Sequence, residues 1–83
     1  MNPVLADAIG LAGSAVMIAA YAYSNMAARV DFVLFNILNL VGAALLIVSL
    51  CVHFNLASML LEIAWSAIAL LGLAKALRAR TSP

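Results

Sequence analysis

The chain has 83 residues, of which 69% are hydrophobic and 8% charged, with a formal net charge of +1. Soluble globular domains carry about a quarter charged residues, so this composition excludes that class and indicates an integral membrane protein. So small a charge gives no basis for nucleic-acid binding. We expect one all-α domain over residues 1–83 that crosses the lipid bilayer three times.

The first apolar run covers residues 5–23, within the length of about 17–25 residues that a membrane-spanning helix needs. No basic residue precedes it, so we interpret it as a retained span rather than a signal peptide. Ala6, Gly10 and Ser14 recur every four residues and share one helix face. Gly13 lies beside that face. Small residues at this spacing predict a seam where another helix packs closely.

The second run covers residues 32–52, with Asp31 in the position of a helix N-cap. Asn36 and Asn39 stand three residues apart, and Gly42 follows on the same stripe. Asn39 lies about 10 Å along the helix from its start, inside the hydrocarbon. An amide at that depth needs a partner, which is either a neighbouring helix or a polar ligand in a cavity.

The third run covers residues 56–74, with Asn55 as its expected N-cap. An acid near a helix centre in hydrocarbon costs on the order of 2–3 kcal/mol, so Glu62 should have either a structural partner or a function. Trp65 lies about 13 Å from the helix start, deeper than an interfacial tryptophan. It serves either helix packing or a solute site. One continuous face of this run holds Ser58, Glu62, Trp65, Ser66, Ala69 and Gly72.

The distribution of basic residues predicts the orientation of the chain. Arg29, Lys75, Arg78 and Arg80 all fall on the side of the first loop and the C-terminus. The positive-inside rule then places the N-terminus outside and the C-terminus in the cytoplasm. Three basic residues after the last span are fewer than the four to eight of a polybasic lipid-binding cluster, so they indicate topology rather than lipid recognition. The fold prediction is a three-helix bundle in the membrane.

Signals of catalysis are absent from the sequence. There is one His and one Cys, with no metal-ligand cluster, no glycine-rich phosphate loop and no nucleophile at a readable spacing from a base. We therefore expect no enzymatic activity, no cofactor and no metal site. His53, in the second loop, is interpreted as a solvated interfacial residue, with a proton relay as the less favoured alternative.

Two motifs carry a resemblance to a known family. The second span contains N-L-V-G-A at residues 39–43, and the third contains a glutamate three residues before a tryptophan, then I-A-L at residues 68–70. This pattern resembles an uncharacterised family of small bacterial three-helix inner-membrane proteins, over nearly the whole chain. The resemblance implies an inner-membrane location and carries no activity.

A more distant resemblance concerns the size, the three-helix plan and the Asn- and Trp-bearing faces. These features are similar to the SemiSWEETs, half-size sugar transporters that pair two three-helix protomers around a central cavity. Their first helix carries a proline-containing hinge motif, whereas no proline lies within a span here. Alternating access in this chain would need a different motion.

Three helices with a polar stripe on two of them cannot enclose that stripe alone, so we expect a homo-oligomer or a membrane-protein partner. One hypothesis is a homodimeric transporter of a small polar solute. Its alternative is a structural or accessory subunit that docks into a membrane complex through the same polar faces. The residues predicted to bind substrate in the first hypothesis are Asn36, Asn39, Glu62 and Trp65.

Overall fold

The computed structural model describes residues 1–81 and contains three helices, α1 (Pro3–Met26), α2 (Phe32–Leu50) and α3 (Leu56–Thr81). Each is long and apolar enough to cross a membrane. The all-α class and the three predicted helices are therefore confirmed. Helix α3 continues from the predicted end of its span at residue 74 to Thr81, so its last turns carry the basic residues beyond the apolar segment.

Side-chain caps mark where the helices begin. The side-chain oxygen of Asp31 accepts a hydrogen bond from the backbone amide of Val33 at 3.0 Å, and that of Asn55 accepts one from Ser58 at 3.0 Å. These are the two predicted N-caps, and both are confirmed. The cap of α1 is Asn2, which the sequence analysis did not identify. Each cap satisfies an amide that has no partner inside the helix.

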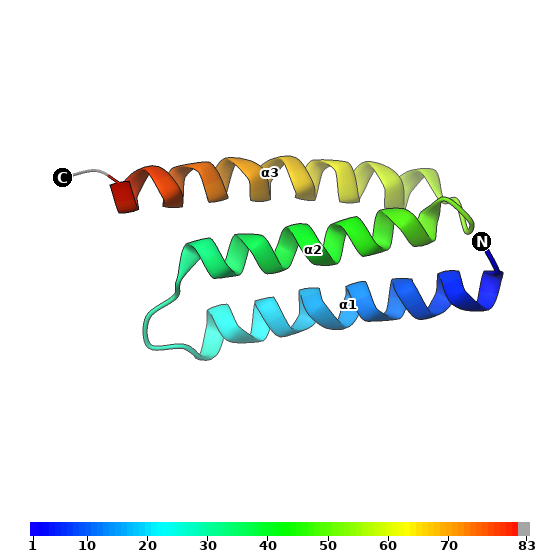
Figure 1. Cartoon of the computed structure of the whole chain (residues 1–83), viewed down its shortest axis with the longest axis horizontal. Helices are drawn as coiled ribbons and strands as arrows, with labels where there is room; N and C mark the ends of the chain where they lie inside the picture. The colour runs from blue at the N-terminus through cyan, green and yellow to red at the C-terminus, as the bar shows by residue number, and fades with distance from the viewer. Residues whose placement is uncertain (82–83) are drawn as a thin grey trace.

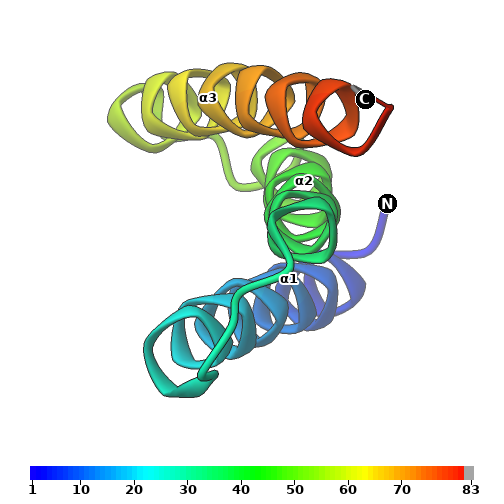
Figure 2. The same cartoon turned by 90° about the vertical axis from the view of Figure 1, so that its left-hand side faces the viewer.

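Helix α2 lies in the middle of the molecule, with α1 on one side and α3 on the other (Figures 1 and 2). Among the described residues, α1 and α3 each pack against α2 and make no contact with each other. The predicted bundle is thus open rather than closed. The reason is that α2 buries small and polar residues toward both neighbours, whereas α1 and α3 each bury a single seam.

The interior contains no large side chain that is fully buried, within the described residues. Helix association here depends on close approach of backbones rather than on an apolar core, as is usual between helices in lipid. The large apolar side chains point outward, where lipid would cover them. The buried residues are Ala6, Gly13, Ala20, Asn36, Asn39, Gly42, Ala43, Glu62 and Ala69.

The seam between α1 and α2 is centred on Gly13. A Cβ atom placed there would lie 2.7 Å from the carbonyl oxygen of Gly42, so only glycine fits. The buried positions of α1 are Ala6, Gly13 and Ala20, which repeat every seven residues. Of the predicted seam, Ala6 is buried, and a Cβ atom at Gly10 would lie 2.7 Å from the hydroxyl oxygen of Ser49, so both face α2, while Ser14 is half-buried. Four-residue steps rotate about 40° each around a helix, whereas seven-residue steps drift by only about 20°, so the buried row continues through Gly13 and Ala20.

Candidate functional site

The predicted polar stripe forms the contact between α2 and α3. Asn36, Asn39 and Glu62 are buried, with 8%, 4% and 8% of their surfaces exposed, whereas Trp65 is 42% exposed. Helix periodicity places Asn36 and Asn39 on the α2 face that meets α3, and Glu62 and Trp65 on the α3 face that meets α2. All four predicted residues therefore lie on the contacting faces of two helices.

A hydrogen bond between Trp65 and Asn39 joins the two helices. The indole Nε1 of Trp65 donates to Oδ1 of Asn39 at 3.0 Å. The amide nitrogen of Asn39 donates to the backbone oxygen of Phe35 at 2.8 Å, within its own helix. The side chain of Asn39 thus has a partner for both its donor and its acceptor. This is the interhelical hydrogen bond that one of the two interpretations of Asn39 predicted.

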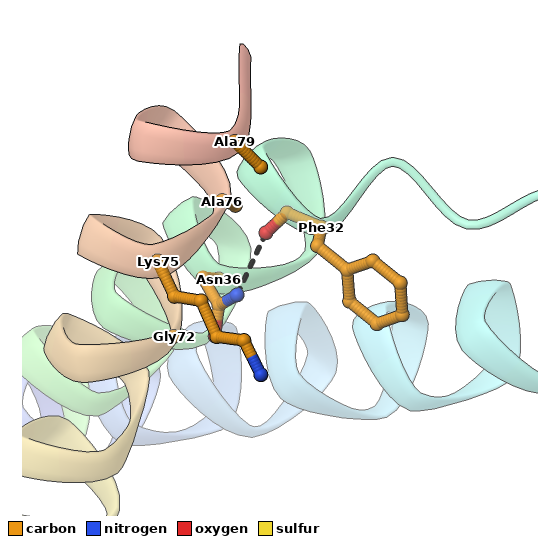
Figure 3. Close-up of a pocket in the computed structure, with 6 residues that line it drawn as sticks. All are labelled: Phe32, Asn36, Gly72, Lys75, Ala76 and Ala79. Carbon is orange, nitrogen blue, oxygen red and sulfur yellow. Dashed lines mark hydrogen bonds between the residues drawn. The ribbon is translucent and has the colours of Figure 1, made fainter. Parts of the chain in front are cut away.

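Asn36 is held one turn nearer the start of α2. Its amide nitrogen donates to the backbone oxygen of Phe32 at 2.7 Å (Figure 3). A Cβ atom at Gly72 of α3 would lie 2.7 Å from Oδ1 of Asn36, so the backbone of α3 passes directly over this amide. Gly72 therefore leaves room for the Asn36 side chain between the helices. The sequence analysis placed Gly72 on the polar face of α3 but did not predict this contact.

Glu62 is the unsatisfied member of the group. Its Oε2 atom is buried and has no hydrogen-bond partner in the described part of the chain. Because the helices are antiparallel and Trp65 meets Asn39, Glu62 lies one turn further toward the loop at residues 51–55. Buried polar groups nearly always have a partner, so an exception calls for an explanation. In a membrane the usual explanation is function.

Trp65 borders two cavities. One, of about 220 Å³, lies between α2 and α3 and is lined by Phe35, Asn36, Asn39, Trp65, Ile68 and Ala69. The other, of about 390 Å³, lies between α1 and α3 and is lined by Met17, Ile18, Tyr21, Ala22 and Trp65. Three of the four predicted site residues line the first cavity, and Glu62 lines neither. Both walls are mainly apolar.

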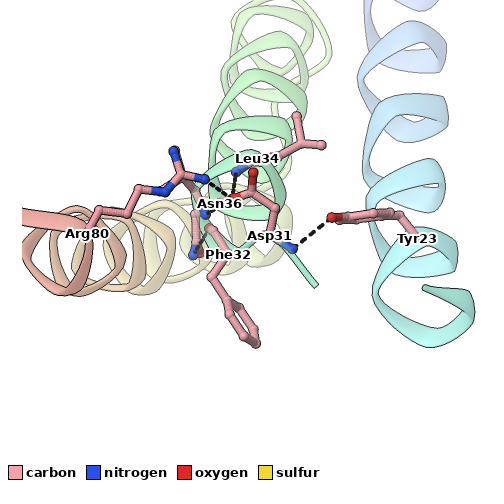
Figure 4. Close-up of polar contacts among 7 residues, drawn as sticks. Tyr23, Asp31, Phe32, Leu34, Asn36 and Arg80 are labelled. Atoms are coloured by element: carbon pink, nitrogen blue, oxygen red, sulfur yellow. Dashed lines mark hydrogen bonds and ion pairs between the residues drawn. The ribbon is translucent and has the colours of Figure 1, made fainter. Parts of the chain in front are cut away.

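A second polar group lies at the end of the molecule where α2 begins. Arg80 donates to Oδ1 of Asp31 at 2.7 Å, and the backbone amide of Asp31 donates to the hydroxyl of Tyr23 at 2.7 Å (Figure 4). The hydrogen bond from the backbone amide of Leu34 and the Arg80 guanidinium lower the pKa of Asp31. These contacts join all three helices at one end. The predicted topology placed Asp31 and Arg80 on the same side of the membrane, and this was the sequence signal for the pair.

The opposite end has its own contact. Nε2 of His53 lies 3.0 Å from Oδ1 of Asp7 and 3.2 Å from the backbone oxygen of Pro3. This joins the loop between α2 and α3 to the start of α1. His53 is exposed, as an interfacial residue should be, but it is paired rather than only solvated. Within the described residues, no cluster of His, Cys, Asp and Glu could hold a metal ion.

Comparison with known proteins gives one match. No curated protein and no solved structure matches the chain. A family model matches residues 6–80, which include all of α2, nearly all of α1 and α3, and every candidate site residue. The family is uncharacterised, so its match identifies relatives and assigns no activity. On this evidence the chain belongs to that uncharacterised family of small proteins.

Proposed function

We propose that the protein binds a small polar solute inside the membrane and carries it across as a homodimer, in the manner of the SemiSWEETs. The observation that carries this proposal is the buried Oε2 atom of Glu62, which has no hydrogen-bond partner among residues 1–81. A carboxyl oxygen in hydrocarbon needs a hydrogen-bond donor. In this proposal a solute hydroxyl or amine supplies that donor, so the role of the protein is binding and transport rather than catalysis.

Trp65 would provide the second contact of the solute. Its N–H edge is occupied by Asn39, while the ring borders the cavities on both sides. A ring held at one edge presents its faces for stacking without a large loss of side-chain entropy. Asn36 and Asn39 line the same cavity; both amide nitrogens donate to the backbone, and Oδ1 of Asn39 already accepts from Trp65, so Asn36 offers the available acceptor oxygen. We propose that the oxygen of Asn36 selects solutes that donate hydrogen bonds, and that Glu62, one turn beyond Trp65 and outside both cavities, is a further acceptor on the path of the solute.

The open arrangement of the helices supports self-association. Because α1 and α3 do not touch, one protomer leaves the groove beside Trp65 uncovered on the side between them. A second protomer would close it, as the two halves of a SemiSWEET enclose one cavity. The lack of contact between α1 and α3 also permits either helix to rock against α2, which would replace the missing proline hinge.

A second candidate is an accessory subunit of a larger membrane complex. The observation that favours it is that Asn36, Asn39 and Trp65 already find partners within the chain. Their polar groups then serve helix packing, and the open faces of α1 and α3 dock against another membrane protein. In either proposal we place the N-terminus outside and the C-terminus in the cytoplasm of an inner membrane, from the position of the basic residues.

The test combines the mass of the assembly with solute uptake. We would measure the intact mass of the wild type, Glu62→Gln and Trp65→Ala in nanodiscs, with Leu70→Ala as the control on an exposed position. Uptake of glucose, glycerol and glycine into proteoliposomes follows for the same four proteins. The transport proposal expects a dimer in all four, with uptake lost only in the first two variants.

Two outcomes would contradict the transport proposal. If the wild type has the mass of one protomer, no cavity can be shared between two protomers, and the proposed dimeric transporter is excluded. Dissociation of the dimer in Glu62→Gln or Trp65→Ala, with Leu70→Ala intact, would show that the polar face joins the protomers. The accessory role would then account better for Glu62, and capture of a membrane partner through that face would be the next experiment.

A further inference from the structure

A separate cavity at the basic end of the molecule has the chemistry of a lipid site. It has a volume of about 310 Å³ and lies between the start of α2 and the last turns of α3 (Figure 3). Its lining combines an apolar wall with one ammonium group and one amide. The lining residues are Phe32, Asn36, Gly72, Lys75, Ala76 and Ala79.

A second cavity adjoins it. This cavity, of about 380 Å³, shares Phe32 and Ala76 with the first and adds Arg29 and Arg80 to the lining. Arg80 is paired with Asp31, so its charge is partly compensated. Neither Lys75 nor Arg29 takes part in the two ion pairs found among the described residues. Two uncompensated cations therefore line the adjoining cavities, Lys75 in the first and Arg29 in the second.

The depth of this site matches the bilayer surface. Lys75 lies 19 residues after the start of α3 at Leu56. At the helical rise this is about 28 Å, close to the thickness of about 30 Å of the hydrocarbon layer. The ammonium of Lys75 therefore stands at headgroup level, while Gly72 and Asn36 reach one turn deeper. A ligand here has its charge at the surface and its apolar part in the membrane.

We propose that these adjoining cavities bind an anionic phospholipid, with its phosphate between Lys75 and Arg29 and one acyl chain running inward from Phe32 past Gly72. Basic pockets between membrane helices on the cytoplasmic side are typical sites for such headgroups. The number of basic residues after the third span alone argued against lipid recognition. The fold changes that conclusion, because it brings Arg29 from the first loop beside the last helix and provides a cavity between them. The proposal does not depend on transport.

The experiment is native mass spectrometry of the full chain released from micelles that contain phosphatidylglycerol or phosphatidylcholine. We would compare the wild type with Lys75→Gln, with Lys75→Gln/Arg29→Gln and with Arg78→Gln. Arg78 lines neither cavity, so its variant removes a charge without touching the site. We expect phosphatidylglycerol adducts in the wild type and in Arg78→Gln, with about fivefold weaker binding for each charge removed at the site.

A larger side chain on the shared wall tests the space in the cavities separately from the charges. Ala76→Leu fills the wall that the two cavities share, and we expect it to weaken lipid binding while circular dichroism shows unchanged helix content. Equal retention of both lipids by the wild type, or an equal loss in Arg78→Gln and Lys75→Gln, would overturn the proposal. Displacement of the lipid by millimolar inorganic phosphate, with the same dependence on Lys75, would also overturn it, since the ligand would then be a free anion.

Discussion

The indole N–H of Trp65 donates to Oδ1 of Asn39 across the contact between α3 and α2. The sequence placed both residues deep in their spans, and the structure makes them one hydrogen-bonded pair. The pair fixes the register of α3 against α2, because Gly72 then meets Asn36 two turns later. Glu62, one turn before Trp65, is left in the same interface with an oxygen that has no hydrogen-bond partner in the part of the chain that the structure describes.

The energy of this pair can be measured in a double-mutant cycle. We expect a coupling of about 0.6 kcal/mol, and no more than about 1.7 kcal/mol, between Trp65→Phe and Asn39→Ala, because interhelical hydrogen bonds in membrane proteins are modest. The measurement is the free energy of unfolding in mixed micelles, followed by circular dichroism. Pairing Trp65→Phe with Ser66→Ala provides the control, and coupling of the same size in that cycle would contradict a specific bond.

The seam between α1 and α2 should reject any side chain at Gly13. Gly13→Val places methyl groups against the backbone oxygen of Gly42, and we expect a loss of about 2 kcal/mol or more, with separation of α1. Ala12→Val, at the adjacent exposed position, is the matched control and should change stability by less than about 0.5 kcal/mol. Thermal unfolding in detergent gives both values, and similar midpoints for the two variants would exclude the proposed seam.

Glu62 should lower the stability of the folded protein when no ligand is bound. Replacing it with Leu removes the unpartnered oxygen, so we expect Glu62→Leu to be more stable by about 1–3 kcal/mol, with Glu62→Gln gaining less. The measurement is unfolding of the ligand-free protein in detergent. If Glu62→Leu is instead less stable than the wild type, the carboxyl group has a structural partner and is not held for a solute.

The capping carboxylate at Asp31 should make stability depend on pH in acid. Its pKa in the folded protein lies below the ordinary value of 3.8, chiefly because the amide of Leu34 donates to it. A lowered pKa contributes stability at pH values above 3.8, and that contribution is lost as the pH falls through the folded pKa. Asp31→Asn keeps a good N-cap without the charge, so its melting temperature should fall less between pH of about 5 and about 2. Parallel curves for the two proteins would contradict this role.

The orientation can be read from the one native cysteine. Cys51 is exposed at the end of α2, on the side opposite the basic residues. With the N-terminus outside, a membrane-impermeant maleimide added to intact cells should label Cys51 in the wild type. It should not label Thr81→Cys in a Cys51→Ser background until the membrane is opened. The reverse pattern of labelling would show that the topology is inverted.

Much of the fold followed from local chemistry. Hydrophobic length predicted the three helices, and Asp31 and Asn55 were recognisable as caps because they directly precede the apolar runs. The candidate site was also predictable as a set of residues. Asn36, Asn39, Glu62 and Trp65 stand out because polar or indole groups at mid-membrane depth are costly or unusual.

The partners of these residues were not predictable in the same way. Two interpretations of Asn39 stayed open, and the structure supports packing for it, because its amide group is fully used by Phe35 and Trp65. The seam on α1 contains the predicted Ala6 and Gly10, but its buried row continues through Gly13 and Ala20, while Ser14 is half-buried; small residues are common throughout that helix, so several faces looked alike. Which face is used depends on what α2 presents to it.

The sequence by itself determined that the chain has three membrane-length helices, where α2 and α3 begin and which residues are polar at depth. These properties depend on hydrophobic length, capping and the cost of polar groups in hydrocarbon, which are local. Only the tertiary structure decided that α2 lies between α1 and α3, that Trp65 meets Asn39 while Oε2 of Glu62 finds no partner among the described residues, and that Arg29 and Lys75 flank adjoining cavities. Such pairings depend on which helix faces fit together, because small residues allow close approach on more than one face.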